Sequence, residues 1–163
     1  MKTFILMIAL TVTAISAYSN PPSKLDEVVI HYLHLKNALA TDNTSEAARA
    51  GEQLQAALIT LGTQTMSEAQ KKAYSGISED AEKNAGHISK SSGNIRHQRE
   101  YFQSLSKDIY DLVKTFGAPQ TLYQYYCPMV KASWLSEVKS IQNPYFGKSM
   151  QACGTIKETI SGQ

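Results

Sequence analysis

Four sulfur-bearing side chains lie near the C-terminal end of the chain, in two pairs. Cys127 and Met129 are two residues apart, and Met150 and Cys153 are three apart. In an extended segment the first pair shares one face, and a turn of helix would place the second pair on one face. Thiolate and thioether sulfur are the ligands that Cu(I) prefers, and imidazole is acceptable to it. The spacing therefore indicates a Cu(I) site with reduced cysteines, and with His97 as a further ligand.

A purely structural role for the cysteines is the alternative. Two cysteines in an exported protein are ordinarily paired. A Cys127–Cys153 disulfide would close a loop of about 26 residues and stabilise the fold by roughly 3–4 kcal/mol. Met129 and Met150 would then fill space in the core. The sequence leaves both interpretations open, and they can coexist if oxidation switches metal binding off.

The histidines also have a second interpretation. His97 stands at the start of a predicted helix, where a bond to a nearby backbone carbonyl explains it at least as well as metal ligation. His31 and His34 are three residues apart beside the apolar face of another predicted helix. Such a pair can bind metal, but we favour solvated histidines on a helix flank.

No motif typical of catalysis accompanies these residues. The chain has no Gly-x-Ser-x-Gly, His-Glu-x-x-His or Gly-x-Gly-x-x-Gly string. Gly147-Lys148-Ser149 echoes a phosphate-binding loop, but Gln142 stands where that motif needs its first glycine. We therefore expect a binding protein and no enzyme.

Residues 1–19 have the pattern of a secretory signal peptide. Lys2 precedes an uncharged apolar run over residues 3–15, and small residues follow up to Ser19. The run is shorter than the ~20 residues that span a membrane. We expect cleavage after Ala17 or Ser19, a periplasmic or secreted product, and no membrane span afterwards. Loss of Lys2 lowers the formal net charge from +2 to +1, which offers no general attraction to nucleic acid.

Helices must position the candidate site, because residues 24–117 show helical periodicity. Apolar residues recur at helical spacing in four segments, over residues 24–40, 45–62, 67–88 and 95–116. Ser23 with Asp26, and Ser67 with Gln70, have the spacing of capping boxes. Four such helices joined by short turns predict an all-α fold, an up-and-down four-helix bundle.

The chain changes character after this region. Residues 118–160 are rich in aromatic residues, and Pro128 and Pro144 argue against long helices there. Residues 120–126 could be extended or form a short fifth helix. We expect residues 118–160 to form an irregular cap, packed by Trp134 and Phe146 onto one end of the bundle. Residues 20–163 would then be a single domain.

Several strings of the tail resemble a known family. The strings are Cys127-Pro128-Met129, Trp134-Leu135-Ser136, Asn143-Pro144-Tyr145-Phe146-Gly147 and Met150-x-x-Cys153-Gly154. Together with the 95–102 segment they resemble a bacterial domain family named only as a domain of unknown function. That family occurs as short exported proteins and fused to periplasmic adaptor subunits of copper/silver efflux pumps. The resemblance implies a role in copper handling, with an efflux adaptor or other metal-handling protein as partner.

Overall fold

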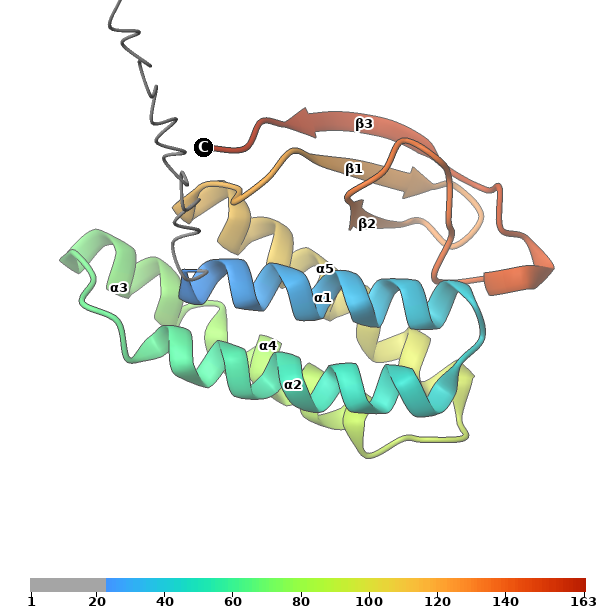
Figure 1. Cartoon of the computed structure of the whole chain (residues 1–163), viewed down its shortest axis with the longest axis horizontal. Coiled ribbons are helices and arrows are strands. Elements are labelled where there is room, and N and C mark those ends of the chain that lie inside the picture. Colours follow the sequence, from blue (N-terminus) through green and yellow to red (C-terminus); the bar gives the residue numbers. More distant parts are fainter. Residues whose placement is uncertain (1–22) are drawn as a thin grey trace, which may run out of the picture.

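Helices form the N-terminal part of the chain and short strands the C-terminal part (Figure 1). A computed structural model describes residues 23–163, so the predicted signal peptide and its cleavage zone lie outside the described residues. The elements in chain order are α1 (Lys24–Ala40), α2 (Thr44–Gly62), α3 (Glu68–Ser75), α4 (Ser78–Ser89), α5 (Ile95–Phe116), β1 (Leu122–Cys127), β2 (Ala132–Ser136), the 3-10 helix η1 (Gly147–Ser149) and β3 (Thr155–Ile160).

The helices α1, α2, α3 and α5 begin where polar side chains bond to their first backbone N–H groups, whereas α4 has no such cap. Ser23 and Asp26 form a reciprocal capping box at α1, and Ser67 and Gln70 form one at α3. Asn94 caps α5 by accepting a hydrogen bond from the His97 N–H. These caps satisfy N–H groups that have no partner inside a helix. The predicted helix over residues 24–40 and the predicted capping boxes are confirmed.

The predicted third helix is divided in two. Residues 67–88 form α3 and α4, with Gly76 and Ile77 between them. Tyr74 at the end of α3 is buried, and its hydroxyl donates to the Leu58 carbonyl of α2 at 2.5 Å. The short α3 thus packs by one tyrosine, which fits the weak apolar stripe of this segment.

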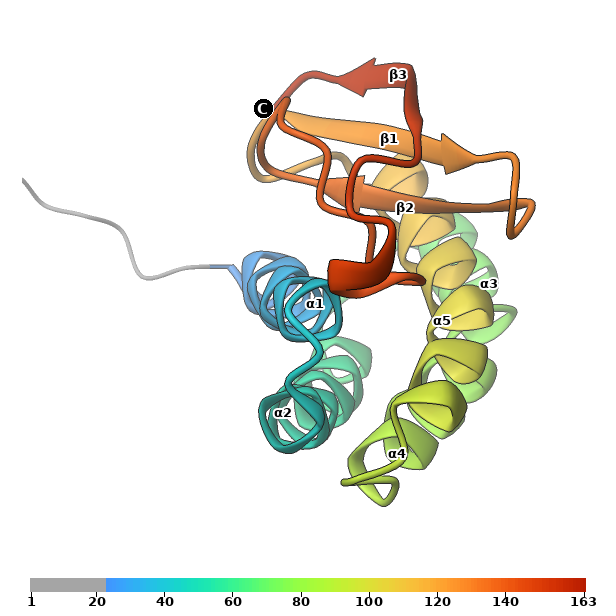
Figure 2. The same cartoon turned by 90° about the vertical axis from the view of Figure 1, so that its right-hand side faces the viewer.

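Three layers make up the molecule (Figure 2). The sheet lies over α1 and α5, and α2 and α4 form the layer on the far side. The inner faces of the helices supply the core, which includes Leu35, Leu54, Leu105 and Ile109, all with 0% of their surface exposed. None of the helices in residues 23–163 is long and apolar enough to cross a membrane.

The prediction of an all-α four-helix bundle with an irregular cap is wrong. Within residues 23–163, five α-helices are accompanied by a three-stranded antiparallel sheet in the order β2-β1-β3. The central strand β1 pairs Tyr125 with Trp134 of β2 and with Ile156 of β3, beside a register shift between Gln124 and Tyr125. Such short strands are stabilised by partners distant in sequence. Local periodicity over residues 118–160 therefore did not reveal them.

Hydroxyl groups of Tyr32 on α1 and of Tyr145, in the segment before η1, cover the outer edge of β2. The Leu135 N–H donates to the Tyr32 hydroxyl at 3.0 Å, and that hydroxyl lies 2.5 Å from the Ser106 hydroxyl. The Tyr145 hydroxyl donates to the Ser133 carbonyl at 2.6 Å. These side chains satisfy backbone groups that another strand would otherwise pair, so they hold the sheet in one position on α1 and α5.

Candidate metal centre

The two cysteines meet although 25 residues separate them in the chain. Cys127 ends β1, and Cys153 lies just before β3. The antiparallel pairing of Tyr126 with Thr155 brings these strand ends together. The thiols share a hydrogen bond, and both are free in the structure, Cys127 buried and Cys153 half-buried. The predicted proximity of the cysteines is therefore what the structure shows.

Asn143 positions the segment that carries Cys153. This side chain is fully buried. Its amide group donates to the Cys153 carbonyl at 2.6 Å, and its carbonyl oxygen accepts from the Tyr145 N–H at 2.8 Å. It also contacts the Cys127 thiol. One asparagine thus ties the Asn143-Pro144-Tyr145 turn to both cysteines.

Gly154 allows a close approach of Trp134 next to the site. A Cβ atom on Gly154 would lie 2.6 Å from the indole ring, and its φ of 155° also favours glycine. The buried Trp134 stacks on Tyr125 with a centroid distance of 5.1 Å and meets Tyr145 edge-on at 6.0 Å. This aromatic cluster packs against the segment that carries Cys153 and Gly154.

The surroundings of the two thiols give them different proton affinities. Burial raises the pKa of Cys127, but hydrogen bonds from Cys153, from the Val130 and Met129 N–H groups and from Asn143 outweigh burial and lower this pKa below its usual value. The hydrogen bond to Cys127, followed by burial, raises the pKa of Cys153. Cys127 is therefore the more acidic thiol of the pair, and Cys153 is the one that holds its proton more tightly.

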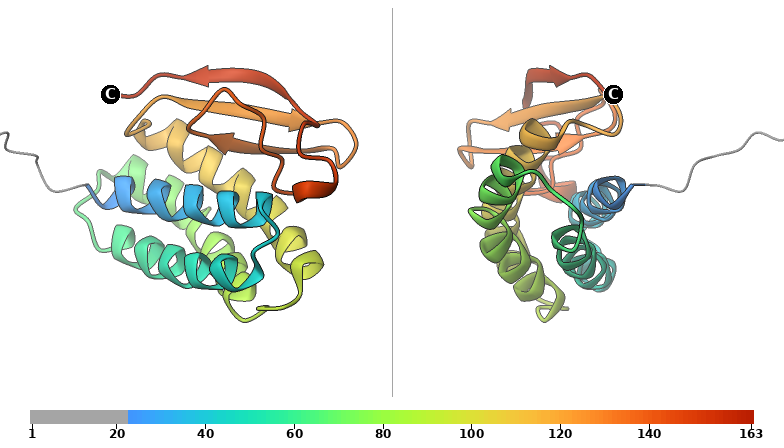
Figure 3. Two further views of the ribbon diagram at one scale, coloured as in Figure 1. Left: turned by 45° about the vertical axis from the view of Figure 1, so that its right-hand side comes forward. Right: turned by 90° about the vertical axis from the view of Figure 1, so that its left-hand side faces the viewer.

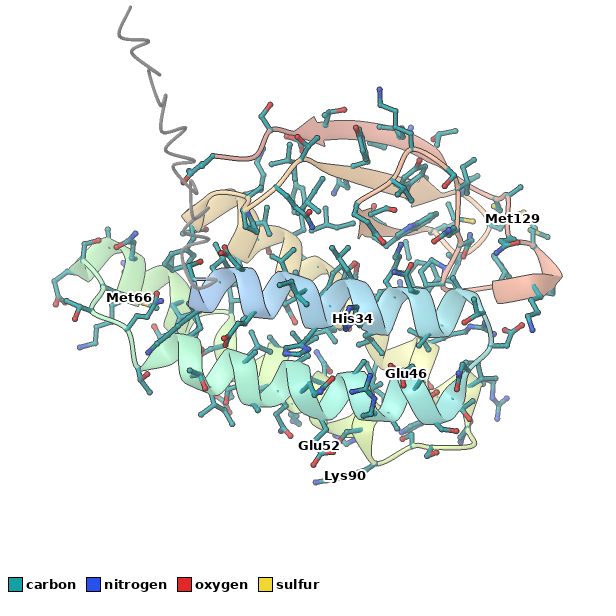
Figure 4. The ribbon with its side chains drawn as sticks, viewed as in Figure 1. His34, Glu46, Glu52, Met66, Lys90 and Met129 are labelled. Carbon is teal, nitrogen blue, oxygen red and sulfur yellow. The ribbon has the colours of Figure 1, made fainter. Side chains whose placement is uncertain are left out.

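Both predicted methionine ligands lie on the segments that carry the cysteines, and both are exposed. Met129 is in the β1–β2 turn with 65% of its surface exposed, and Met150 is 40% exposed. The Cys153 N–H donates to the Met150 carbonyl at 3.4 Å. Figure 4 shows Met129 projecting from the end of the sheet. We call residues 127–131 and 147–157 together the sulfur end.

His97 lies in a different cluster. Its ring meets Tyr101 at a centroid distance of 4.7 Å and His87 at 6.4 Å, at the junction of α4 and α5. Within residues 23–163, no three His, Cys, Asp or Glu side chains are grouped so that they could hold a metal ion. The donors that the structure brings together are the two thiols, and His97 lies in a separate cluster with His87 and Tyr101.

His31 and His34 form a second histidine pair, on α1. Their ring centroids lie 6.2 Å apart. Burial, followed by the neighbouring His34, lowers the pKa of His31. His34 is exposed and faces Glu46 of α2 across a shallow pocket (Figure 4). The structure shows no contact between these two histidines and the two thiols.

Sequence reasoning missed two positioning residues. At the level of the sequence, Asn143 was recognised only as part of the motif that begins Asn143-Pro144. The asparagine before a proline was the one feature of the sequence that could have indicated its role in a turn. Lys36, on the buried face of α1, forms an ion pair with Glu137 at 2.9 Å with its side chain 0% exposed. It joins α1 to the segment that follows β2. Nothing in the helical pattern distinguished this lysine from a solvated one.

Comparison with known proteins gives a family and no function. A family profile described as "Protein of unknown function (DUF3347)" matches residues 28–121, more than half of the chain. The matched range covers most of α1, the whole of α2 to α5, and ends before β1, so both cysteines lie outside it. No curated protein and no solved structure matches the chain.

Proposed function

We propose that this chain, which belongs to the DUF3347 family of proteins of unknown function, is an exported module that binds Cu(I) and buffers it or delivers it to a metal efflux system. The observation that carries the proposal is the contact between Cys127 and Cys153, with Met129 and Met150 exposed on the same two segments. Cu(I) is the cargo of the module and takes no part in catalysis.

The chemistry of the donors fits a soft cation. Two thiols that bind one metal ion must lie next to each other, as the hydrogen-bonded Cys127 and Cys153 do. An all-sulfur donor set favours Cu(I) over harder ions. The imidazoles and carboxylates that Zn²⁺ would need as third and fourth ligands do not join the thiols within residues 23–163.

The proton arrangement also favours metal uptake. Metal binding requires thiolates, so each thiol must lose its proton. Hydrogen bonds from two backbone N–H groups already lower the pKa of Cys127. The proton of Cys153 is the harder one to remove, because the pKa of this thiol is raised. One of the two thiols therefore loses its proton more readily than an ordinary cysteine does.

The proposed location and partner of this module are inferred from its N-terminal sequence and from the family that its C-terminal motifs resemble. The signal-like residues 1–19 place it in the periplasm or outside the cell. The resemblance to domains fused to copper/silver efflux adaptors makes such an adaptor, or another metal-handling protein, the expected partner. In this proposal the chain binds and transfers metal and catalyses no reaction.

A second function is favoured by the same contact. Two adjacent thiols can oxidise to a Cys127–Cys153 disulfide, and a metal-free interaction module would use the bridge to stiffen its sheet. The depressed pKa of Cys127 favours disulfide formation as well, because the thiolate is the reactive species. In the first function Cys127 and Cys153 work as reduced thiols, and in the second they form a disulfide.

Competitive titration separates the two functions. The reduced mature chain is titrated with Cu(I) in the presence of a chromogenic Cu(I) chelator, because any exposed thiol takes up free Cu(I). We expect one ion per chain. Cys127→Ser/Cys153→Ser should abolish competition with the chelator, and Met129→Leu/Met150→Leu should weaken it and leave the fold intact. Met66→Leu, remote from the sulfur end (Figure 4), is the matched control.

Several results would favour the disulfide module instead. They are a bridge that resists mild reductant, no competitive uptake by the reduced chain, and a lowered melting temperature as the main effect of losing the cysteines. Uptake that survives loss of both cysteines would contradict the proposed site and direct attention to His31 and His34.

A further inference from the structure

The sulfur end carries a rim of exposed apolar side chains. Residues 23–163 expose six large apolar side chains, at Ile30, Ile59, Met129, Val138, Met150 and Ile156. Three of them belong to the sulfur end, where Met129, Met150 and Ile156 are 65%, 40% and 41% exposed. Exposed apolar side chains that gather at one place typically mark a contact surface.

Lysines stand between these apolar residues. Lys131 follows Met129 in the β1–β2 turn, Lys148 lies in η1, and Lys157 extends over the Tyr126 ring at 5.5 Å. All three are exposed, and none is in an ion pair among those the structure shows. The rim therefore combines apolar contact area with uncompensated positive charge.

The neighbouring acidic groups do not neutralise this rim. Asp42, which accepts a hydrogen bond from the Lys148 N–H, is ion-paired with Arg99. Glu158 of β3 is ion-paired with Lys114 of α5. Figure 3 shows η1 beside the end of α1, and Figure 1 shows both at the end of the molecule that also carries the β1–β2 turn. A partner meets that end as a positive surface.

We propose that the sulfur end docks an acidic surface of a partner protein that presents a methionine or cysteine to the thiol pair. The negative charge is required to match the lysines. The partner's sulfur rests on the proposed function: a Cu(I) ion held by two thiols passes to a partner when that partner supplies a competing soft ligand. A second copy of this chain is disfavoured, because it would bring two sets of lysines together.

A pair of short synthetic peptides tests this surface on the full mature chain. One peptide has a single methionine flanked by aspartates, and in the other lysines replace the aspartates. Binding is measured by fluorescence anisotropy at low salt, with and without one equivalent of Cu(I). We expect the acidic peptide to bind and the basic peptide not to bind. Lys131→Glu/Lys148→Glu/Lys157→Glu should weaken binding of the acidic peptide roughly tenfold or more and allow the basic peptide to bind.

The control variant carries the same change of charge elsewhere. Lys71→Glu/Lys72→Glu/Lys83→Glu alters exposed lysines of α3 and α4, and it should bind the acidic peptide as the wild type does. Equal loss in both variants would overturn the proposal, and so would stronger binding to phosphatidylglycerol vesicles or self-association that the rim variant abolishes. The rim variant should keep its Cu(I) affinity. Failure of Cu(I) uptake would refute the proposed function alone, because peptide binding without metal still tests the surface.

Discussion

The helical layers are packed by apolar side chains, whereas the sheet layer is held by apolar packing together with buried polar contacts. Inside the helical layers, apolar side chains such as Leu54, Leu105 and Ile109 account for the packing. The sheet joins the same apolar core through Leu122 and Leu135, and buried polar groups such as the Tyr32 hydroxyl and the Lys36 ammonium attach it to α1 as well. Apolar packing tolerates small adjustments, whereas hydrogen bonds need one geometry. The site lies in the part of the molecule whose position is the more exactly determined.

The largest effect should come from a cavity in the helical core. Ile109→Ala removes a side chain with 0% exposure and should lower the free energy of unfolding by roughly 2–5 kcal/mol. Ile59→Ala, at a side chain that is 53% exposed, is the control and should stay within about 0.5 kcal/mol. Chemical denaturation of both variants measures the difference. A near-neutral Ile109→Ala would show that α5 is not the central core helix.

A smaller effect should follow loss of one polar attachment of the sheet. Tyr145→Phe removes the hydroxyl that donates to the Ser133 carbonyl at 2.6 Å, and it should lower the free energy of unfolding by about 1–2 kcal/mol. Tyr123→Phe is a matched control on β1, since its hydroxyl makes none of the hydrogen bonds that the structure shows. If the two variants are equally stable, the edge of β2 does not depend on this hydroxyl.

The contrast between the layers also explains what the sequence could reveal. Residues 24–40 and 95–116 carry their packing information at local helical spacing, so these helices were predicted. The pairing of Tyr125 with Trp134 and Ile156 depends on partners up to 31 residues away, and spacing along the chain does not encode it. Cys127 and Cys153 were correctly expected to be neighbours, because both interpretations of the pair required it. The buried Asn143 that fixes their arrangement became visible only in the folded chain.

The smallest expected change in the free energy of unfolding concerns Asp108, a half-buried carboxyl group on α5. Burial, opposed by a hydrogen bond from Asn84 and reinforced by Asp80 and Asp111, raises the pKa of Asp108 to about 6. The folded state therefore binds this proton more tightly than the unfolded state, and its contribution to stability is lost as the pH rises from about 4 to about 6. Asp108→Asn should stabilise the protein by about 1 kcal/mol at pH 7.5, a value discounted for partial exposure.

The same variant should be close to neutral at pH 4, where Asp108 is protonated in the folded state. Thermal melts at the two pH values measure the difference. A substitution that destabilises the protein at pH 7.5 would show that the carboxylate is stabilised by its neighbours, against the direction of this pKa shift.

The most direct test of the proposed metal centre is X-ray absorption at the copper edge of the reduced chain loaded with one Cu(I). The account predicts a shell of sulfur neighbours around the copper, without the scattering pattern of imidazole, and an unchanged spectrum for His97→Ala. A spectrum dominated by imidazole nitrogen, or one that lacks sulfur in the wild-type chain, would contradict a metal centre built on Cys127 and Cys153.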